Sequence, residues 1–161
     1  MRKRNQAAIY LGIIIISLII VNIMSKGPRY LGVDNGFFKK CPKSPNCIST
    51  QSDPSDEGHY MEPIKYSTTK EEAYENILEV INSMKRTKII TKSDSYIHAE
   101  FRIKILIFVD DVEFYIDDEN KVIHFRSASR VGYSDTGLNR RRMEDFVVLF
   151  NELISQPSTS S

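Results

Sequence analysis

The spacing of hydrophobic and polar residues changes along the chain, and each spacing predicts a different element. Apolar residues recur at helical intervals in the stretch that follows residue 67, at Ala73, Ile77, Val80, Ile81 and Met84. Thr68 or Thr69 can cap this helix, because Glu71 or Glu72 follows as in a capping box. The pattern predicts an amphipathic helix that buries one face.

Beyond this helix the apolar residues alternate with polar ones. The alternation predicts strands at residues 88–92, 96–103, 105–117 and 121–129, each with one covered face, as is typical of an antiparallel sheet. Asn139 is a suitable cap for a second amphipathic helix that carries Met143, Phe146, Val147, Phe150 and Ile154. The predicted fold class is α+β, with an antiparallel sheet of about four strands flanked by two helices.

The register of the last two strands follows from matching their faces. Residues that pair across antiparallel strands share a face of the sheet. Val112 and Phe114 are therefore expected on the face of Ile123 and Phe125, which requires a tight loop of two or four residues within 118–121. The opposite face is then polar, with Asp111, Glu113, Tyr115, His124 and Arg126, extended by His98 and Glu100.

Asp110 breaks the alternation, since a regular strand would point it into the core, where an unpaired carboxylate is costly. A β-bulge at residues 110–111 would turn Asp110 outward. Alternatively, Asp110 pairs inside with backbone N–H groups or with Arg130, Arg140 or Arg142. We expect Arg130 to pair with Asp110, and Arg140 and Arg142 to lie nearer the surface.

The N-terminal residues 1–25 have the composition of a membrane segment. Arg2, Lys3 and Arg4 precede an uncharged run at 7–24, long enough to span a bilayer as a single helix. A cleaved signal peptide is the alternative, but the run is longer than a signal core and lacks a small-residue cleavage site. The positive N-terminal tail predicts a single-pass protein of the cell membrane with its domain on the extracytoplasmic side.

Residues 26–66 are rich in proline and glycine and read as a long loop segment. This segment contains CPKSPNC, with Cys41 and Cys47 as the only cysteines of the chain. Two cysteines supply half of a structural zinc site, and their spacing differs from C-x-x-C. A disulfide is therefore expected in an oxidising compartment. We expect this segment to pack on an α+β domain at 67–155, which a polar tail at 156–161 follows.

The stretch 126–142, RSASRVGYSDTGLNRRR, is the candidate functional region. It is too polar to form a core, and it places arginines at the start of the last helix, where positive charge opposes the helix dipole. A carboxylate or an outside anion is expected to compensate for them. The candidate functional cluster comprises Asp110, Asp111, Glu113, Arg126, Ser127, Ser129, Arg130, Tyr133, Ser134, Asp135, Asn139, Arg140 and Arg142.

Three blocks, CPKSPNC, DDVEF and RSASRVGYSDTGLNRRR, resemble the signature blocks of a bacterial and plastid family catalogued as domain of unknown function 1499. The resemblance covers most of the chain after about residue 32, and the only departure we see is at Thr50, where a smaller residue such as serine is expected. It implies that the motif residues belong to the family pattern, and it implies no activity.

Two classes of function are consistent with these residues. The first is a non-catalytic binding or structural module that contacts a protein partner or an anionic ligand through the arginine-rich turn. The second is a hydrolase or metal-dependent enzyme that uses Asp111, Glu113, His98 and His124. The chain lacks the common catalytic motifs, so we favour the module and expect no cofactor or metal. The net charge of +1 gives no reason to expect nucleic acid.

Overall fold

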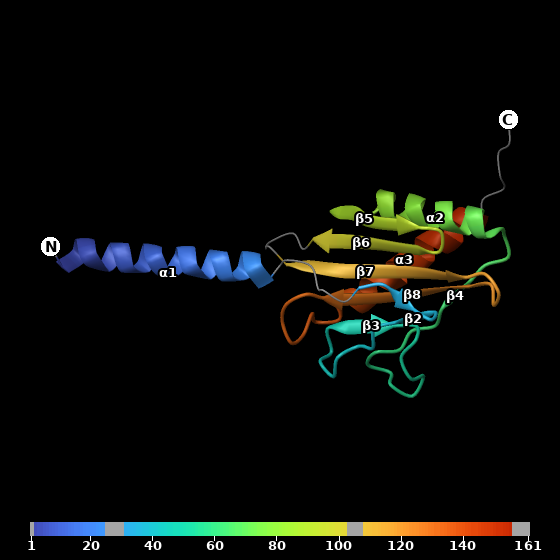
Figure 1. Ribbon diagram of the computed structural model, residues 1–161, viewed down its shortest axis with the longest axis horizontal. Coiled ribbons are helices and arrows are strands. Elements are labelled where there is room, and N and C mark those ends of the chain that lie inside the picture. The colour runs from blue at the N-terminus through green and yellow to red at the C-terminus, as the bar shows by residue number, and fades with distance from the viewer. Residues whose placement is uncertain (1, 25–30, 103–107, 156–161) are drawn as a thin grey trace.

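An antiparallel sheet organises the computed structural model, which describes residues 2–24, 31–102 and 108–155 (Figure 1). Its central strands are β5 (Thr87–Ser93), β6 (Tyr96–Arg102), β7 (Val109–Asp117) and β8 (Val122–Ser129). Residues 25–30, 103–107 and 156–161 lie outside the described part, and with them the predicted strand ends at 103 and 105–107 and the predicted polar tail. Strands β6, β7 and β8 form the centre of the fold.

The predicted pairing of the last two strands is confirmed. Phe114 pairs with Phe125 and Asp117 with Val122, so the connecting loop has four residues, 118–121. Asp110 pairs regularly with both β6 and β8, and no bulge occurs at this point. The carboxyl of Asp110 therefore lies on the core side of the sheet.

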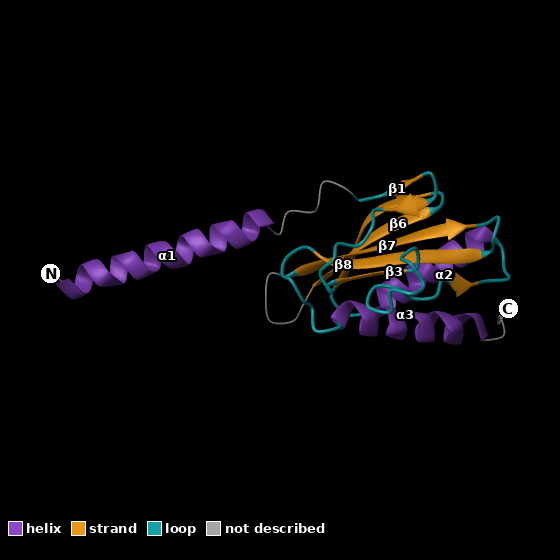
Figure 2. Ribbon diagram, turned by 90° about the horizontal axis from the view of Figure 1, so that it is seen from below, coloured by secondary structure: helices purple, strands orange, loops and turns teal. Residues whose placement is uncertain are grey.

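The predicted number of strands is wrong. The sheet has six strands in the described residues, because β3 (Cys47–Ser49) and β4 (Ile64–Lys65) both pair with the outer edge of β8. A separate hairpin, β1 (Val33–Asp34) and β2 (Phe37–Phe38), lies on the other face from the helices (Figure 2). These strands have two or three residues each, too few to show an alternating pattern among the prolines and glycines of this segment.

The predicted transmembrane helix is also wrong. Residues Arg2–Met24 form helix α1, whose first five residues are the polar sequence RKRNQ. Among the residues that the structure describes, no helix is both long and apolar enough to cross a membrane.

Two amphipathic helices, α2 (Lys70–Ser83) and α3 (Leu138–Ser155), cover one face of the sheet (Figure 2). Thr69 caps α2 and accepts a hydrogen bond from the Glu72 amide, as the sequence predicts. The core between helices and sheet includes Ile77 and Ile81 of α2, Phe146 and Phe150 of α3, and Phe114 of β7. Burying such large side chains stabilises the fold by about 1.5–3 kcal/mol each.

Candidate functional site

The polar motif residues divide between the two faces of the sheet. Alternation along β7 places Asp110 on the helix-facing side and Asp111 and Glu113 on the opposite side. All three carboxylates are buried, with at most 1% of each residue exposed. Buried charges must be paired to be tolerated, so each one defines a network of polar partners.

On the helix-facing side, Asp110 forms an ion pair with Arg142 of α3, with 2.5 Å between Oδ2 and the guanidinium nitrogen. Arg142 also donates to Oδ1 of Asn139 at 2.8 Å, and Ser127 of β8 donates to the same oxygen. The Arg142 guanidinium lies 5.0 Å from the centre of the Phe101 ring. This network ties the first turn of α3 to the middle of the sheet.

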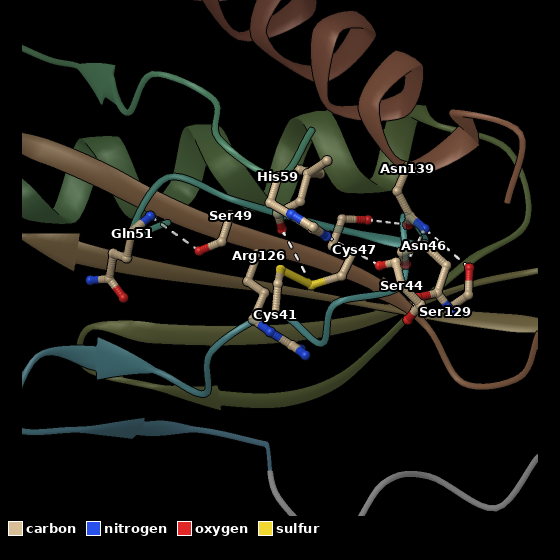
Figure 3. Close-up of a disulfide and its surroundings, with 12 residues drawn as sticks. Cys41, Ser44, Asn46, Cys47, Ser49, Gln51, His59, Arg126, Ser129 and Asn139 are labelled. Atoms are coloured by element: carbon tan, nitrogen blue, oxygen red, sulfur yellow. Dashed lines mark hydrogen bonds between the residues drawn. A yellow bond between two sulfur atoms is a disulfide. The ribbon is translucent and has the colours of Figure 1, made fainter. Parts of the chain in front are cut away.

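Asn139 connects that network to the disulfide loop, residues 41–47 (Figure 3). The side-chain nitrogen of Asn139, Nδ2, donates to the Asn46 backbone carbonyl at 3.1 Å and to the Ser129 hydroxyl at 3.0 Å. The Asn46 side chain in turn donates to the Gly132 carbonyl at 2.6 Å. One chain of hydrogen bonds therefore joins residues from all three signature blocks.

The disulfide between Cys41 and Cys47 is present, as the sequence predicts. Cys47 belongs to β3 and is fully buried, whereas Cys41 is partly exposed. The bond closes the loop directly beside Asn46, and it limits the conformations from which Asn46 can reach Gly132.

On the opposite side of the sheet, Asp111 is the centre of a second network. Arg130 donates to both of its carboxylate oxygens, at 2.7 and 2.8 Å, and also to Glu100 at 2.6 Å. His98 contacts Asp111 at 2.7 Å. Burial would raise the pKa of Asp111, but the bonds from Arg130 and His98 outweigh burial and lower it. Asp111 is therefore held as a carboxylate.

Glu113 forms the adjacent part of this second network. It accepts hydrogen bonds from Arg126 at 3.0 Å, from Tyr96 at 2.9 Å and from the Gly32 amide at 2.7 Å. Burial and the Glu113 carboxylate both raise the pKa of Tyr96, which keeps its phenol protonated as a donor. The bond to Gly32 fixes the start of the segment that covers this face.

The structure corrects the expected partner of Asp110. That partner is Arg142, whereas Arg130 lies across the sheet with Asp111. Arg140 donates to the carbonyls of residues 57, 58 and 60 and so holds the loop that follows β3. Arg142 is buried, so the expectation that it lies nearer the surface is wrong, whereas Arg140 is partly exposed, and each of the three arginines has partners within the protein.

The turn 130–138 leads from β8 to α3 and holds the remaining predicted residues. The Asp135 carboxylate accepts hydrogen bonds from the backbone amides of Gly137 and Asn139. Asp135 therefore caps the N-terminus of α3, and the prediction that Asn139 is the cap is wrong. Thr136 has a φ of 55°, which is unfavourable for a β-branched residue. Tyr133 is 75% exposed, and Ser134 accepts a bond from the Thr136 amide.

The four residues of the proposed enzymatic face do not form one open site. His98 and Glu113 are buried, whereas His124 lies between Tyr115 and the hydroxyl of Thr50. Burial lowers the pKa of His124. Within the described residues, no three histidine, cysteine, aspartate or glutamate side chains are arranged to hold a metal ion.

Sequence reasoning missed the roles of Asn46 and Tyr96, and it assigned Thr50 none. Thr50 bonds His124 and the backbone of Phe125, so its hydroxyl holds the loop segment against β8. Tyr96 shares a face with Glu113 by alternation, which is a usable signal. Asn46 donates a hydrogen bond to Gly132, which lies 86 residues later in the sequence, and no local pattern indicates that contact.

The fold and the networks define a class of protein: an α+β domain in which the motif residues form buried ion pairs and hold two loops together. The chain belongs to the family described as Protein of unknown function (DUF1499), whose model matches residues 38–150, and the resemblance of the three blocks is thereby confirmed. A search of curated proteins finds no match.

Proposed function

We propose that this chain is a non-catalytic binding module that contacts a protein partner through two adjacent loops. These loops are residues 41–47 and 130–138, which together form what we name the paired-loop surface. The observation that carries the proposal is the bond from Asn46 to Gly132, which joins the two loops beside the exposed side chain of Tyr133.

The buried networks support this function through their energetics. Replacing a buried ion pair with well-packed apolar residues is often neutral or stabilising, so such pairs are a weak source of stability. In some proteins such pairs instead specify one geometry, and we propose that role here. Here Asn139, which is bonded to Arg142 of the Asp110 pair, also bonds the Asn46 carbonyl in one loop and Ser129 at the base of the other, which supports a role in maintaining the loop geometry.

Tyr133 has the properties of a binding anchor. Tyrosine offers a large, rigid contact surface with a polar tip, and it is enriched among residues that dominate the energy of interfaces. Tyr133 is 75% exposed on a turn whose backbone is fixed by Asp135 and Asn46. A fixed loop loses less conformational entropy on binding.

The geometry does not favour the enzymatic alternative. Asp111 and Glu113 are at most 1% exposed and are already paired with Arg130 and Arg126, so substrate has no access to them. We further propose that the domain works in an oxidising, extracytoplasmic compartment. The disulfide at the base of the paired-loop surface supports this location.

Site-specific photo-crosslinking in the native cell tests the proposed function. A photoreactive residue at position 133 should give a discrete crosslinked protein, whereas one at Val148, which is 55% exposed on α3, should not. Asn46→Ala should weaken the product at position 133, because it frees Gly132. No product at 133, or the same product at both positions, would contradict the proposal.

A further inference from the structure

A cleft of about 550 Å³ is lined in part by Cys41, Pro42 and Lys43 of the disulfide loop, and Gly132 does not line it. Residues 37–43 line the cleft, together with Ser49 at the end of β3 and Gln51, Ser52, Asp53, Asp56 and His59 of the loop that follows. Its volume lies within the range of about 300–1,000 Å³ that is usual for small-molecule sites. We name it the lysine cleft, because Lys39, Lys40 and Lys43 line it and are exposed.

The segment that carries these lysines has a fixed backbone. The Phe38 amide donates to the Gln51 side chain at 2.8 Å, and Gln51 donates to the Gly36 carbonyl at 2.7 Å. Cys41 stands between Lys40 and Lys43 in the chain and is joined to Cys47 of β3. The backbone that carries these lysines is therefore fixed at Phe38 by Gln51 and at Cys41 by the disulfide.

The acidic residues of the cleft are engaged with groups other than Lys40 and Lys43. Asp53 accepts from the amide and hydroxyl of Ser55, at 2.9 and 2.8 Å. Asp56 contacts His59 at 2.8 Å. Among the described residues, Lys40 and Lys43 form no ion pair. Asp53 and Asp56 remain negatively charged in these contacts, but neither is paired with Lys40 or Lys43, so the ammonium groups of these two lysines can contact an outside group.

We propose that the lysine cleft binds a small polyanion, a molecule with closely spaced carboxylate or phosphate groups. Ammonium groups attract such anionic oxygens as point charges and donate charge-assisted hydrogen bonds to them. Phe37 also lines the cleft, and its exposed ring provides an apolar surface for the uncharged part of the ligand. This site goes beyond the proposed function, because Tyr133 does not line it.

Isothermal titration of the full chain with pyrophosphate and with citrate tests the site and distinguishes the two sources of anionic oxygen. We expect at least one of the two to bind at low salt and to bind more weakly as ionic strength rises. Lys40→Gln/Lys43→Gln should weaken this binding about tenfold or more, since it removes two charges. The same ligand should raise the melting temperature of the natural protein more than that of the variant.

Lys65→Gln/Lys88→Gln is the matched control, because both lysines are exposed and lie outside the cleft. It should bind the anion as the natural protein does. Binding of neither anion, or equal loss in both double variants, would overturn the inference. Either result would leave the crosslinking of position 133 unaffected, so the two proposals fail separately.

Discussion

Arg142 and Asp110 form an ion pair that joins the first turn of α3 to the central strand β7, with both side chains at most 9% exposed. Its position resolves a conflict in the sequence. A carboxylate at an inward-facing strand position and an arginine near a helix N-terminus are each unfavourable alone. Together they neutralise each other, although Oδ1 of Asp110 has no hydrogen-bond partner in the described part of the chain.

Removing either partner of this pair should destabilise the fold strongly. Asp110→Ala and Arg142→Ala are each expected to lower the free energy of unfolding by about 3–5 kcal/mol, because each leaves an uncompensated buried charge. Urea unfolding followed by circular dichroism measures the change. Arg102→Ala is the control, since its contact with Glu100 is 3.5 Å long and exposed, and it should cost less than about 1 kcal/mol.

The double variant Asp110→Ala/Arg142→Ala should be more stable than the sum of the two single losses implies. The coupling arises because the second substitution removes the charge that the first one left unpaired. Additive losses would mean that the two residues act independently and that the pair is not the link between α3 and the sheet.

The network on the opposite face predicts a response to acid. The pKa of Asp111 is lowered in the folded protein, so its contribution to stability is present above its ordinary pKa and is lost as pH falls through the lowered value. Arg130→Gln removes the main cause of this shift. The variant should therefore unfold at a higher pH than the natural protein in an acid titration, and an unchanged midpoint would contradict the role of Arg130.

Thr136 predicts a stabilising substitution. Its φ of 55° is costly for a β-branched residue, whereas asparagine tolerates this conformation. Thr136→Asn should raise the free energy of unfolding by about 0.5–1 kcal/mol, a part of the usual cost of such strain. Thr68→Asn is the control, because Thr68 is not among the residues with positive φ, and it should bring no gain. A loss of stability in Thr136→Asn would show that the turn needs threonine for another reason.

The disulfide should contribute moderately to stability. The closed loop is short, so the Cys41→Ser/Cys47→Ala variant is expected to lose about 2–3 kcal/mol and still to fold, because the sheet and helices do not depend on this bond. Thermal unfolding with and without a reductant provides the check. Reductant should lower the melting temperature of the natural protein only, and a variant that fails to fold would assign the bond a larger role.

The pairing of β7 and β8 could be predicted because alternation along both strands is regular. Only a two-residue or a four-residue loop places Phe114 and Phe125 on one face, and the structure has the four-residue loop. The inward position of Asp110 follows from the same argument. Sequence reasoning is reliable here because a shift by one residue would bury the polar face.

The partner of Asp110 could also have been found by following that argument further. Asp110 pairs with Ser129, so Arg130 must lie on the opposite face. Arg142 precedes Phe146 by four residues and follows Asn139 by three, which places all three on the buried face of α3. The three consecutive arginines at 140–142 obscured this spacing, because only Arg142 lies on the buried face of α3.

Strands β3 and β4 could not be predicted, because two or three residues show no periodicity. Their pairing depends on β8, which lies more than fifty residues later in the sequence. The contact between Asn46 and Gly132 has the same origin, since the pairing of β3 with the end of β8 brings these two residues together. These features depend on tertiary structure and cannot be predicted from local sequence patterns.

Amide hydrogen exchange in residues 131–138 most directly tests the claim that the buried networks hold the paired-loop surface. Asn46→Ala removes the bond to Gly132 while leaving β6 and β7 intact. We predict that exchange in 131–138 becomes about tenfold faster or more, the equivalent of about 1.4 kcal/mol, while the protection of β6 and β7 is unchanged. Tyr133→Ala should change neither rate. Equal exchange of residues 131–138 in the natural protein and in Asn46→Ala would contradict the claim.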